Sequence, residues 1–394
     1  MAERRYLVIG GGIAGVSAAE AIREQDPSGR IVLLSAEREL PYARPLLSKA
    51  PLLSPEMKKL ALHPQKWYTD RDIELRLGVA ARHLDTQRRT VDCGGETLPY
   101  DRCVLALGAN NFIPPFQGRE EVPLCGLRTL DDLRRLQRLA LGKERAVVIG
   151  GGVIGLELAA ELVRYGLEVS VLEAMPSLMP RLIGPDISRW LQEQLPRLHI
   201  HTGVSITRLY RSGEEMVVEA DGGQWTCQVL AAACGVRANT ALAAEAGIDC
   251  QRAIVVNERM ETSAAGVYAC GDCAQFQGFN AALWNQGLRQ GAAAGNSAAG
   301  GQAVYTGCDT SLVLNLDGTA LFAMGNLSPA DGRTEWEDWP ARTPFQVDPR
   351  RPAVPGRCVR VWQGDRLVGA ALLGDLTGMQ ALKAELREQG GFVC

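Results

Sequence analysis

One motif occurs twice in this chain, and it constrains the fold more than any other feature. The stretch YLVIGGGIAGVSAAEAI begins at Tyr6, and AVVIGGGVIGLELAAEL begins at Ala146. Each copy has an apolar, β-branched run, a GxGxxG pattern and an alanine-rich segment, which predict a buried strand, a tight loop and a helix. Two such units predict an α/β fold with two Rossmann-like dinucleotide-binding domains.

The glycines of each copy have separate physical roles in such a loop. The first permits a tight turn, the second lets the backbone approach a pyrophosphate, and the third lets the helix pack close to the strand. The helix N-terminus then offers unpaired N–H groups and a positive potential to the phosphates. The residues in these roles are Gly10, Gly12 and Gly15 in the first copy and Gly150, Gly152 and Gly155 in the second.

An acidic residue follows each unit at the end of a further apolar run. The first run, IVLLSAE, ends at Glu37, and the second, EVSVLE, ends at Glu173. A carboxylate in this position can accept hydrogen bonds from ribose hydroxyls. Because both copies combine strand, loop, helix and acid, we expect the chain to bind two dinucleotides.

The composition argues against several other classes of function. The 394 residues carry a formal net charge of -3 with both signs mixed, so neither nucleic acid nor a membrane is expected as a partner. No apolar run is long enough to span a bilayer. The sequence enters its first predicted strand at once, without a signal peptide, which predicts a cytoplasmic location. The 11 cysteines are scattered and odd in number, which argues against a disulfide framework and against a metal site.

Four further segments carry a resemblance to a known family. They are RCVLALGA (102–109), AAACGVRAN (231–239), GVYACGDCA (266–274) and the loop PYARPLLSK (41–49). With the repeat, they resemble the FAD- and NAD-dependent pyridine nucleotide oxidoreductases, in the branch of NADH:rubredoxin reductases, ferredoxin reductases and the flavin domain of nitrite reductases. The resemblance covers residues 5–307. Leu107 and Ala238 depart from it, because the family usually has threonine and proline there.

The resemblance implies a glutathione-reductase-like arrangement of three domains. Residues 1–114 and 235–307 would form a discontinuous FAD-binding domain. An NAD-binding domain of residues 115–234 would be inserted into it. Residues 308–394 would form a small α+β C-terminal domain.

The C-terminal part has its own local pattern. Residues 310–325 alternate apolar and turn residues and predict strands, and CVRVWQGDRLVGAALLG (358–374) predicts a hairpin. TGMQALKAELREQGG (377–391) predicts a short helix with a glycine stop. The proline-rich stretch from Thr334 to Arg357 predicts a long loop.

The resemblance also assigns residues to each nucleotide. The order of the motifs implies FAD on the first glycine loop and NADH on the second, with Asp272 holding the ribityl chain. The residues implied for FAD are Gly10, Gly12, Ala14, Gly15, Glu37, Arg44, Lys49, Ala81, Ala106, Gly108, Asp272 and Trp284. The residues implied for NAD are Gly150, Gly152, Ile154, Gly155, Glu157, Glu173, Arg181 and Gly235.

Residues 36–51 contain no cysteine, although the disulfide reductases of the family place a redox pair in the corresponding segment. The resemblance instead puts Arg44 and Lys49 beside the flavin and pairs Lys49 with Glu157; Lys49 and Glu157 are the candidate catalytic residues. Elementary electrostatics agrees, because cations near the ring favour hydride acceptance. A buried lysine also needs a carboxylate partner to keep its proton.

The other thiols are expected to be structural. Cys270 and Cys273 have the spacing of a redox CxxC pair, but the resemblance places their motif along the ribityl and pyrophosphate groups, away from the reacting edge of the flavin. Cys394 has no neighbouring thiol or basic group that would lower its pKa, and we expect it to be a frayed terminal residue.

These features predict an NADH-dependent FAD flavoprotein that passes electrons to a small iron redox protein, a rubredoxin or a ferredoxin. One alternative is the FAD-containing, NADH-oxidising subunit of a larger iron–sulfur or metal oxidoreductase. Another is a flavin-bearing NADH sensor that acts by binding a partner. A third is an NADH oxidase, whose water-forming version is disfavoured by the missing cysteine. The sequence names neither the acceptor nor the oligomeric state.

Overall fold

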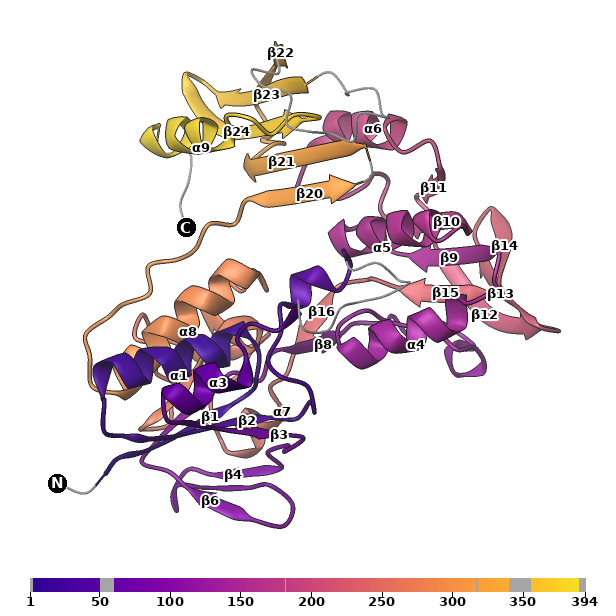
Figure 1. The fold of residues 1–394 in the computed structure, drawn as a ribbon. Helices are drawn as coiled ribbons and strands as arrows, with labels where there is room; N and C mark the ends of the chain where they lie inside the picture. The colour runs from indigo at the N-terminus through magenta and orange to yellow at the C-terminus, as the bar shows by residue number, and fades with distance from the viewer. Residues whose placement is uncertain (1–2, 50–59, 181, 317, 340–355, 390–394) are drawn as a thin grey trace.

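The chain is arranged as three lobes (Figure 1). The computed structural model describes residues 3–49, 60–180, 182–316, 318–339 and 356–389. The lower lobe combines N-terminal segments with later ones drawn in orange, the right-hand lobe holds the middle of the chain, and the upper lobe holds the C-terminal segments. Within the described residues, no helix is long and apolar enough to cross a membrane.

The first lobe is built on a parallel sheet of five strands. Its elements are β1 (Arg5–Ile9), α1 (Ile13–Gln25), β2 (Arg30–Ser35), the 3₁₀ helix η1 (Arg44–Leu46), α3 (Gln65–Asp70), β3 (Ile73–Leu77), β4 (His83–Asp85), β5 (Thr90–Asp92), β6 (Thr97–Pro99), β7 (Arg102–Leu105), α7 (Ala241–Glu245), β17 (Ile254–Val256), β18 (Val267–Ala269), η3 (Gly271–Cys273), β19 (Ala274–Phe276) and α8 (Trp284–Ala298). The strand order is β18-β7-β1-β2-β3. β1 and β2 are buried throughout after a leading arginine, as parallel strands covered on both faces are. The sheet therefore joins N-terminal strands to a strand from much later in the chain.

The second lobe repeats this design with four parallel strands. Its elements are β8 (Ala109–Asn111), η2 (Arg119–Glu121), α4 (Leu130–Ala140), β9 (Arg145–Ile149), α5 (Val153–Arg164), β10 (Glu168–Glu173), α6 (Gly184–Glu193), β11 (Leu198–Thr202), β12 (Ile206–Ser212), β13 (Glu215–Ala220), β14 (Gly223–Cys227), β15 (Val229–Ala232) and β16 (Val236–Ala238). The order is β11-β10-β9-β15, beside the antiparallel sheet β12-β13-β14. The antiparallel pair β8 and β16 carries the chain into this lobe and out of it.

Both strand–loop–helix units predicted from the repeat are present. β1 leads into α1 and β9 leads into α5, in each case through the glycine loop. The predicted α/β class with two Rossmann-like domains is confirmed. The exact domain boundaries stay a prediction.

The upper lobe is an antiparallel sheet with one helix. Its elements are β20 (Leu312–Leu316), β21 (Thr319–Gly325), β22 (Arg333–Trp339), β23 (Gly356–Gln363), β24 (Arg366–Leu373) and α9 (Met379–Glu388), and the strand order is β20-β21-β24-β23-β22. The predicted strands, hairpin and helix are confirmed. Cys394 and residues 340–355 lie outside the described residues.

The prediction of a loop from Thr334 onward is wrong at its start. Residues up to Trp339 form β22, which pairs with β23, for example Trp336 with Val359. Nearly every residue of β22 is exposed, and charges occur on both faces of the strand. An edge strand of this kind lacks the apolar alternation by which strands are recognised, and charges are a common protection of such edges.

The upper lobe packs on the second lobe rather than standing apart. One face of its sheet shares a core with α5 and the start of α6, including Leu314 and Val359 from the sheet and Leu158 and Ile187 from the helices. The other face packs on α9. At the start of α6 the contact is so close that a Cβ added to Gly184 would lie 2.5 Å from Ser328 Oγ. The lobe therefore supports α5 from outside.

Helices α1 and α8 pack against each other at backbone distance (Figure 1). A Cβ added to Gly291 would lie 2.2 Å from the backbone oxygen of Ala14, and one added to Gly295 would lie 2.2 Å from that of Ala18. Glycines four residues apart lie on one face of a helix. This contact holds the N-terminal end of α8 beside the first glycine loop.

We expect Gly291→Ala to lower the free energy of unfolding by about 1–3 kcal/mol, because the added methyl group must push two helices apart. Helix propensity alone predicts the opposite sign, with alanine favoured by about 1 kcal/mol. Chemical denaturation measures the difference. Asn285→Ala, at an exposed position of the same helix, is the control and should cost nothing. A Gly291→Ala protein as stable as the wild type would show that the helices can separate freely.

Candidate active site between the two glycine loops

The glycine loops have the close packing that a dinucleotide site needs. A Cβ added to Gly15 would lie 1.9 Å from the backbone oxygen of Gly10, and one added to Gly155 would lie 1.9 Å from that of Gly150. A Cβ on Gly10 would also lie 2.0 Å from the backbone oxygen of Ala106. Only glycine lets each helix begin this close to the strand before it.

The second glycine of each loop faces open space. No heavy atom of the described residues lies within 4 Å of a Cβ added to Gly12 or to Gly152. These residues are the N-caps of α1 and α5, and neither helix has a side-chain cap. The free backbone N–H groups at these ends can donate to a pyrophosphate. The residues present therefore fit the two expected dinucleotides.

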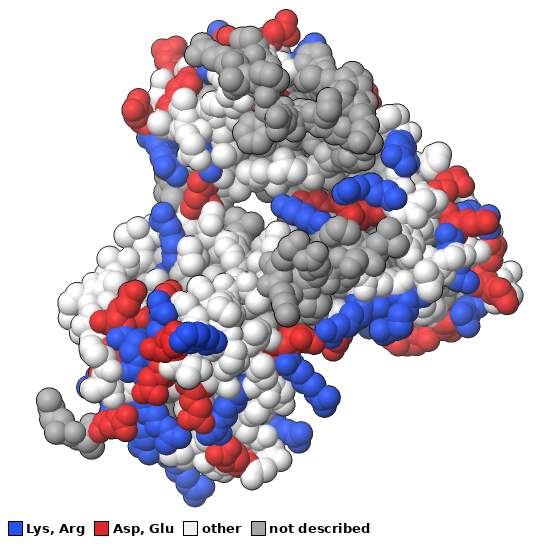
Figure 2. All heavy atoms as spheres, in the orientation of Figure 1, with Lys and Arg blue, Asp and Glu red and all other residues white. Residues whose placement is uncertain are grey.

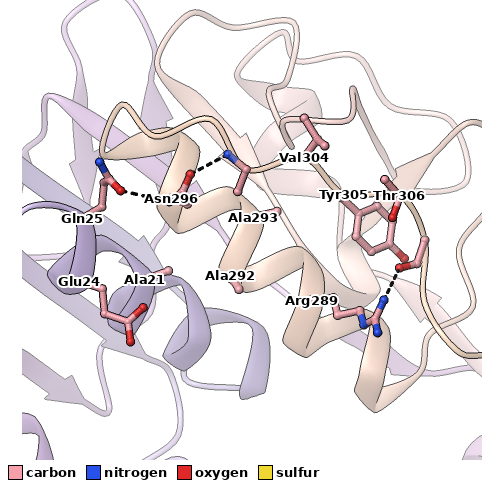
Figure 3. A pocket seen from close by; sticks show the side chains of 12 residues that line it. Ala21, Glu24, Gln25, Arg289, Ala292, Ala293, Asn296, Val304, Tyr305 and Thr306 are labelled. Atoms are coloured by element: carbon pink, nitrogen blue, oxygen red, sulfur yellow. Dashed lines mark hydrogen bonds between the residues drawn. The ribbon is translucent and has the colours of Figure 1, made fainter.

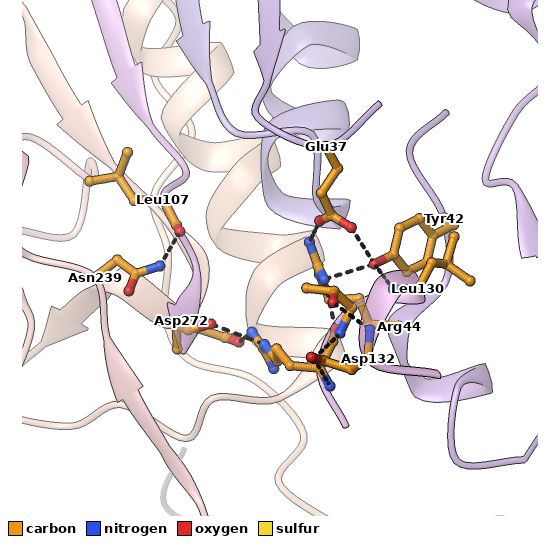
Figure 4. A network of polar contacts seen from close by, with 11 residues as sticks. Glu37, Tyr42, Arg44, Leu107, Leu130, Asp132, Asn239 and Asp272 are labelled. Carbon is orange, nitrogen blue, oxygen red and sulfur yellow. Dashed lines mark hydrogen bonds and ion pairs between the residues drawn. The ribbon is translucent and has the colours of Figure 1, made fainter. Parts of the chain in front are cut away.

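A chain of polar contacts runs beside the first loop (Figure 4). Glu37 forms an ion pair with Arg44 and accepts a hydrogen bond from Tyr42 Oη at 2.6 Å. Arg44 also donates to the backbone oxygen of Arg128 at 2.8 Å, and the Arg128 side chain forms an ion pair with Asp272. Burial raises the pKa of Tyr42, so its hydroxyl keeps its proton and remains a donor. The network thus connects three predicted FAD ligands, Glu37, Arg44 and Asp272.

Tyr42 and Arg128 are members of this network that the sequence analysis missed. The signal available for Arg128 was its position directly before the capping box of α4, in which Thr129 and Asp132 bond to each other's backbone. Asp132 also accepts a hydrogen bond from the backbone N–H of Arg128 at 2.9 Å. The capping box therefore fixes the backbone from which the guanidinium reaches the first lobe.

Three amide side chains, of which Gln286 and Gln290 are buried, hold the loop that carries Asp272. Gln290 accepts a hydrogen bond from the N–H of Gly271 at 2.9 Å, and Asn280 donates to the backbone oxygen of Asp272 at 2.8 Å. Gln286 is 1% exposed and donates to Asn280 at 2.9 Å. All the amides lie on α8 or just before it, and the predicted ligand Trp284 is the first residue of that helix.

The predicted catalytic residues form an ion pair between the first and second lobes. Lys49 Nζ lies 3.4 Å from Glu157 Oε1, with side-chain exposures of 39% and 4%. Glu157 comes from α5, and Lys49 follows η1. Burial raises the pKa of Glu157, and its contacts with Ser48 and Lys49 oppose that rise. The pair itself is present, while its catalytic role stays a prediction.

Glu173 ends β10 with both carboxylate oxygens bound to the backbone. One accepts a hydrogen bond from the N–H of Gly151 at 2.6 Å, and the other accepts one from Met175 at 2.8 Å. The carboxylate is therefore held at the end of the strand, next to the second glycine loop. A negative group fixed in this place opposes a second negative group such as a 2′-phosphate.

The remaining predicted nucleotide ligands lie on several different elements of the first and second lobes. Ala14 and Ile154 are the second residues of α1 and α5. Gly108 and Gly235 follow β7 and β15 with φ angles of 67° and 100°, which favour glycine. Ala81 lies beyond β3 and packs against the core of the first lobe. The predicted ligand Arg181 lies outside the described residues.

Cys270 and Cys273 are fully buried, and neither has the environment of a redox thiol. Burial raises the pKa of Cys270 well above its ordinary value and that of Cys273 to about 11. Their sulfurs contact the backbone oxygens of Ala14 and Leu105. The thiolate is the reactive form, so these cysteines serve packing.

A hollow of about 490 Å³ lies at the other end of α1 (Figure 3). Its walls include Ala21 and Glu24 of α1 and Arg289 and Asn296 of α8, and residues 303–307 complete it. Helix α1 rises about 1.5 Å per residue, so this end is roughly 18 Å from the glycine loop. The hollow is therefore separate from the nucleotide-binding end of the helix.

Comparisons with known proteins agree with this geometry. The family model described as pyridine nucleotide-disulphide oxidoreductase matches residues 4–298. The ferredoxin–NAD(+) reductase subunit of the benzene 1,2-dioxygenase system of Pseudomonas putida is 35% identical over 275 residues, which are 68% of this chain and 66% of that protein. The NAD(P)H nitrite reductase of Bacillus subtilis is 29% identical over 386 residues, 95% of this chain and 46% of that protein.

A solved structure shares the whole fold. The NAD-dependent persulfide reductase from A. fulgidus has a TM-score of 0.88 and 25% sequence identity, over 98% of this chain and 77% of that chain. This chain spans less than two thirds of the length of the ferredoxin–NAD(+) reductase subunit and of the nitrite reductase. The residues matched by the family model end in α8 and include both glycine loops.

We expect Asp272→Ala to purify with little FAD, because loss of a charge-assisted hydrogen bond costs about 1.5–3 kcal/mol, or roughly tenfold or more in affinity. The ratio of flavin to protein absorbance measures this. Asp309→Ala is the matched control, because the Asp309 side chain is also 16% exposed and is also paired with a cation, in the upper lobe. A fully loaded Asp272→Ala protein would show that the ribityl motif has been misplaced.

The fixed carboxylate of Glu173 predicts a preference for NADH over NADPH of at least about tenfold in kcat/KM, or about 1.4 kcal/mol. Glu173→Gln should reduce the ratio of kcat/KM for NADH to kcat/KM for NADPH, because it removes the negative charge of the side chain and keeps its size. Glu168→Gln, at the opposite end of β10, should leave the ratio unchanged. Equal kcat/KM values for the two nucleotides in the wild type would rule the prediction out.

Proposed function

The chain belongs to the pyridine nucleotide-disulphide oxidoreductase family, and on that premise we propose that it is an NADH-dependent FAD reductase that passes electrons to a small iron redox protein. Bound FAD would supply the hydride acceptance and the one-electron release that this activity requires. A rubredoxin or a ferredoxin is the proposed acceptor. The cytoplasmic location expected from the sequence is part of the same proposal.

The observation that carries this proposal is the ion pair of Lys49 and Glu157, in which Lys49 comes from a segment without cysteine. The Lys49 ammonium places a positive charge at the junction of the two lobes that carry the glycine loops. The ion pair with Glu157 holds that ammonium in place. A cation there stabilises negative charge that develops nearby during hydride transfer.

A thiol-based reaction, such as the reduction of a disulfide or a persulfide, is not favoured by the described residues. Thiol exchange needs an accessible thiolate. Cys270 and Cys273, the closest approach to a redox pair, are buried and have raised pKa values. Because these two thiols are unsuited to receive them, the electrons are expected to leave the protein for an external carrier.

The face drawn in Figure 2 does not indicate the carrier by a large patch of one charge sign. Figure 2 shows lysine and arginine side chains intermixed with aspartate and glutamate over the visible face. The net charge of -3 also gives no general attraction for an acidic partner. Identification of the carrier therefore depends on direct measurement.

A second candidate is the FAD-containing subunit of a larger reductase. The match to the nitrite reductase covers 95% of this chain, whereas the match to the ferredoxin reductase subunit covers 68%. The sequence match to the nitrite reductase therefore extends into the upper lobe. If this candidate is right, the acceptor is a partner subunit rather than a freely diffusing carrier.

Anaerobic assays with NADH and purified rubredoxin or ferredoxin test the proposal. The wild type should reduce one of these carriers over many turnovers. Lys49→Met and Glu157→Gln should each slow the bleaching of bound FAD by NADH roughly tenfold, an electrostatic loss of about 1.4 kcal/mol. Stopped-flow absorbance follows that step.

Cys270→Ala and Cys273→Ala serve as controls and should retain most of the activity. Rapid consumption of NADH only with oxygen, or loss of activity in a folded, FAD-loaded Cys273→Ala protein, would contradict the proposal. Reduction of neither carrier, together with normal bleaching of FAD, would favour the larger complex.

A further inference from the structure

Two adjacent residues contact different oxygens of the same buried carboxylate. Ser48 Oγ donates a hydrogen bond to Glu157 Oε2, and Lys49 Nζ lies 3.4 Å from Oε1. Ser48 is 6% exposed and Glu157 is 4% exposed, whereas the Lys49 side chain is 39% exposed. The carboxylate therefore has one buried partner and one partner in contact with solvent.

The two contacts also differ in kind. Lys49 approaches as an ion pair, and Glu157 Oε1 accepts no hydrogen bond from the described residues. The direct hydrogen bond comes from Ser48. Its backbone lies in a turn fixed by the bonds of Leu47 N–H to the oxygen of Arg44 and of Lys49 N–H to that of Leu46. A short serine side chain on a fixed turn loses far less rotamer entropy than a long lysine side chain does.

We propose that Ser48 is a positioning residue of the active site: its hydroxyl fixes the Glu157 carboxylate in the orientation that pairs with Lys49. The hydrogen bond from Ser48 to Glu157 remains when the more exposed Lys49 ammonium moves. The inference rests on the proposed function, because it assigns the pair of Lys49 and Glu157 to the step in which NADH gives up its hydride. Ser48 acts through Glu157 and needs no contact with a nucleotide.

Loss of Ser48 has a defined effect on the protonation of Glu157. Burial raises the pKa of the Glu157 carboxyl, and the Ser48 hydrogen bond and then the Lys49 charge oppose the rise. An anion that loses a donor is less stable, so without Ser48 the pKa rises further. The Glu157 carboxyl is ionised above its pKa. As pH falls, a variant without the Ser48 hydroxyl therefore loses the ionised form at a higher pH than the wild type does.

Among the residues that the structure describes, the other side of α5 brings no charge to Glu157 that would change this sign. Helix α5 packs there on β20, and the shared core includes Leu158 and Leu314. Within the described part of the chain, Ser48 and Lys49 are the polar groups that act on the Glu157 carboxyl. A change in its titration after removal of Ser48 is then assigned to the lost hydrogen bond.

The first experiment measures how fast NADH bleaches FAD in the loaded, full-length protein as a function of pH. We expect Ser48→Ala to be about tenfold slower near neutral pH, and its acid limb to lie at higher pH than that of the wild type. Ser48→Thr keeps the hydroxyl and should restore the position of the limb. Ser297→Ala, another buried serine whose hydroxyl has no partner in the described chain, is the control and should behave as the wild type.

The double variant tests whether Ser48 acts through Glu157. In a Glu157→Gln background, Ser48→Ala should cause no further loss and no change of the pH profile. The proposal would be overturned if Ser48→Ala had the pH profile of the wild type. It would also be overturned if Ser48→Ala slowed FAD bleaching by the same factor in the wild-type and the Glu157→Gln backgrounds. If Ser48→Ala does not fold, Ser48→Thr and Ser48→Val can be compared instead. Their side chains have the same shape, and only Ser48→Thr keeps the hydroxyl.

A second readout does not depend on activity. Infrared spectra of the FAD-loaded protein without NADH should contain a protonated-carboxyl band that titrates with pH and is absent in Glu157→Gln. Its midpoint should lie at higher pH in Ser48→Ala than in the wild type, and equal midpoints would refute the positioning role. Neither readout uses an iron protein, so a failure of the proposed acceptor is recognised separately from a failure of this inference.

Discussion

The buried carboxylate of Glu157 is the contact on which the arrangement of the two nucleotide-binding lobes depends. A buried anion is costly unless donors or cations satisfy it, and here both come from the other lobe. The loop that supplies them must therefore cross to α5. Its apolar residues follow the same route, because Tyr42 and Leu47 belong to the core of the second lobe rather than to that of the first. Polar and apolar contacts together fix how the lobes meet.

The same loop serves the first glycine loop at its other end. Arg44 pairs with Glu37 and reaches the backbone of Arg128, whose side chain pairs with Asp272. A short segment thus links the acid of the first lobe, the start of α4 and the motif before α8. Helix α5 is in turn backed by the sheet of the upper lobe. Each nucleotide-binding end is therefore held by segments distant in sequence.

Under the proposed function, this arrangement gives a fold shared with thiol-using enzymes a different flow of electrons. In the segment where those enzymes carry cysteines, this chain has a serine and a lysine directed at a carboxylate. An ion pair can stabilise charge but cannot accept electrons. The proposed consequence is a reductase whose electrons leave through an external carrier, with the cysteines near the flavin motif confined to packing.

The sequence by itself determined the two strand–loop–helix units, because apolar runs and glycine spacing are local patterns that the backbone must obey. The motifs also predicted the pairing of Lys49 with Glu157, although through family resemblance rather than through spacing. Only the tertiary structure brought Ser48 to Glu157 across 109 positions and Arg128 to Asp272 across 144. It alone showed that the charged segment after Gly332 is an edge strand, because its pairing with β23 leaves no periodic signal. Contacts of this kind depend on how the lobes pack together, and that packing is a sum of many distant interactions that no local pattern encodes.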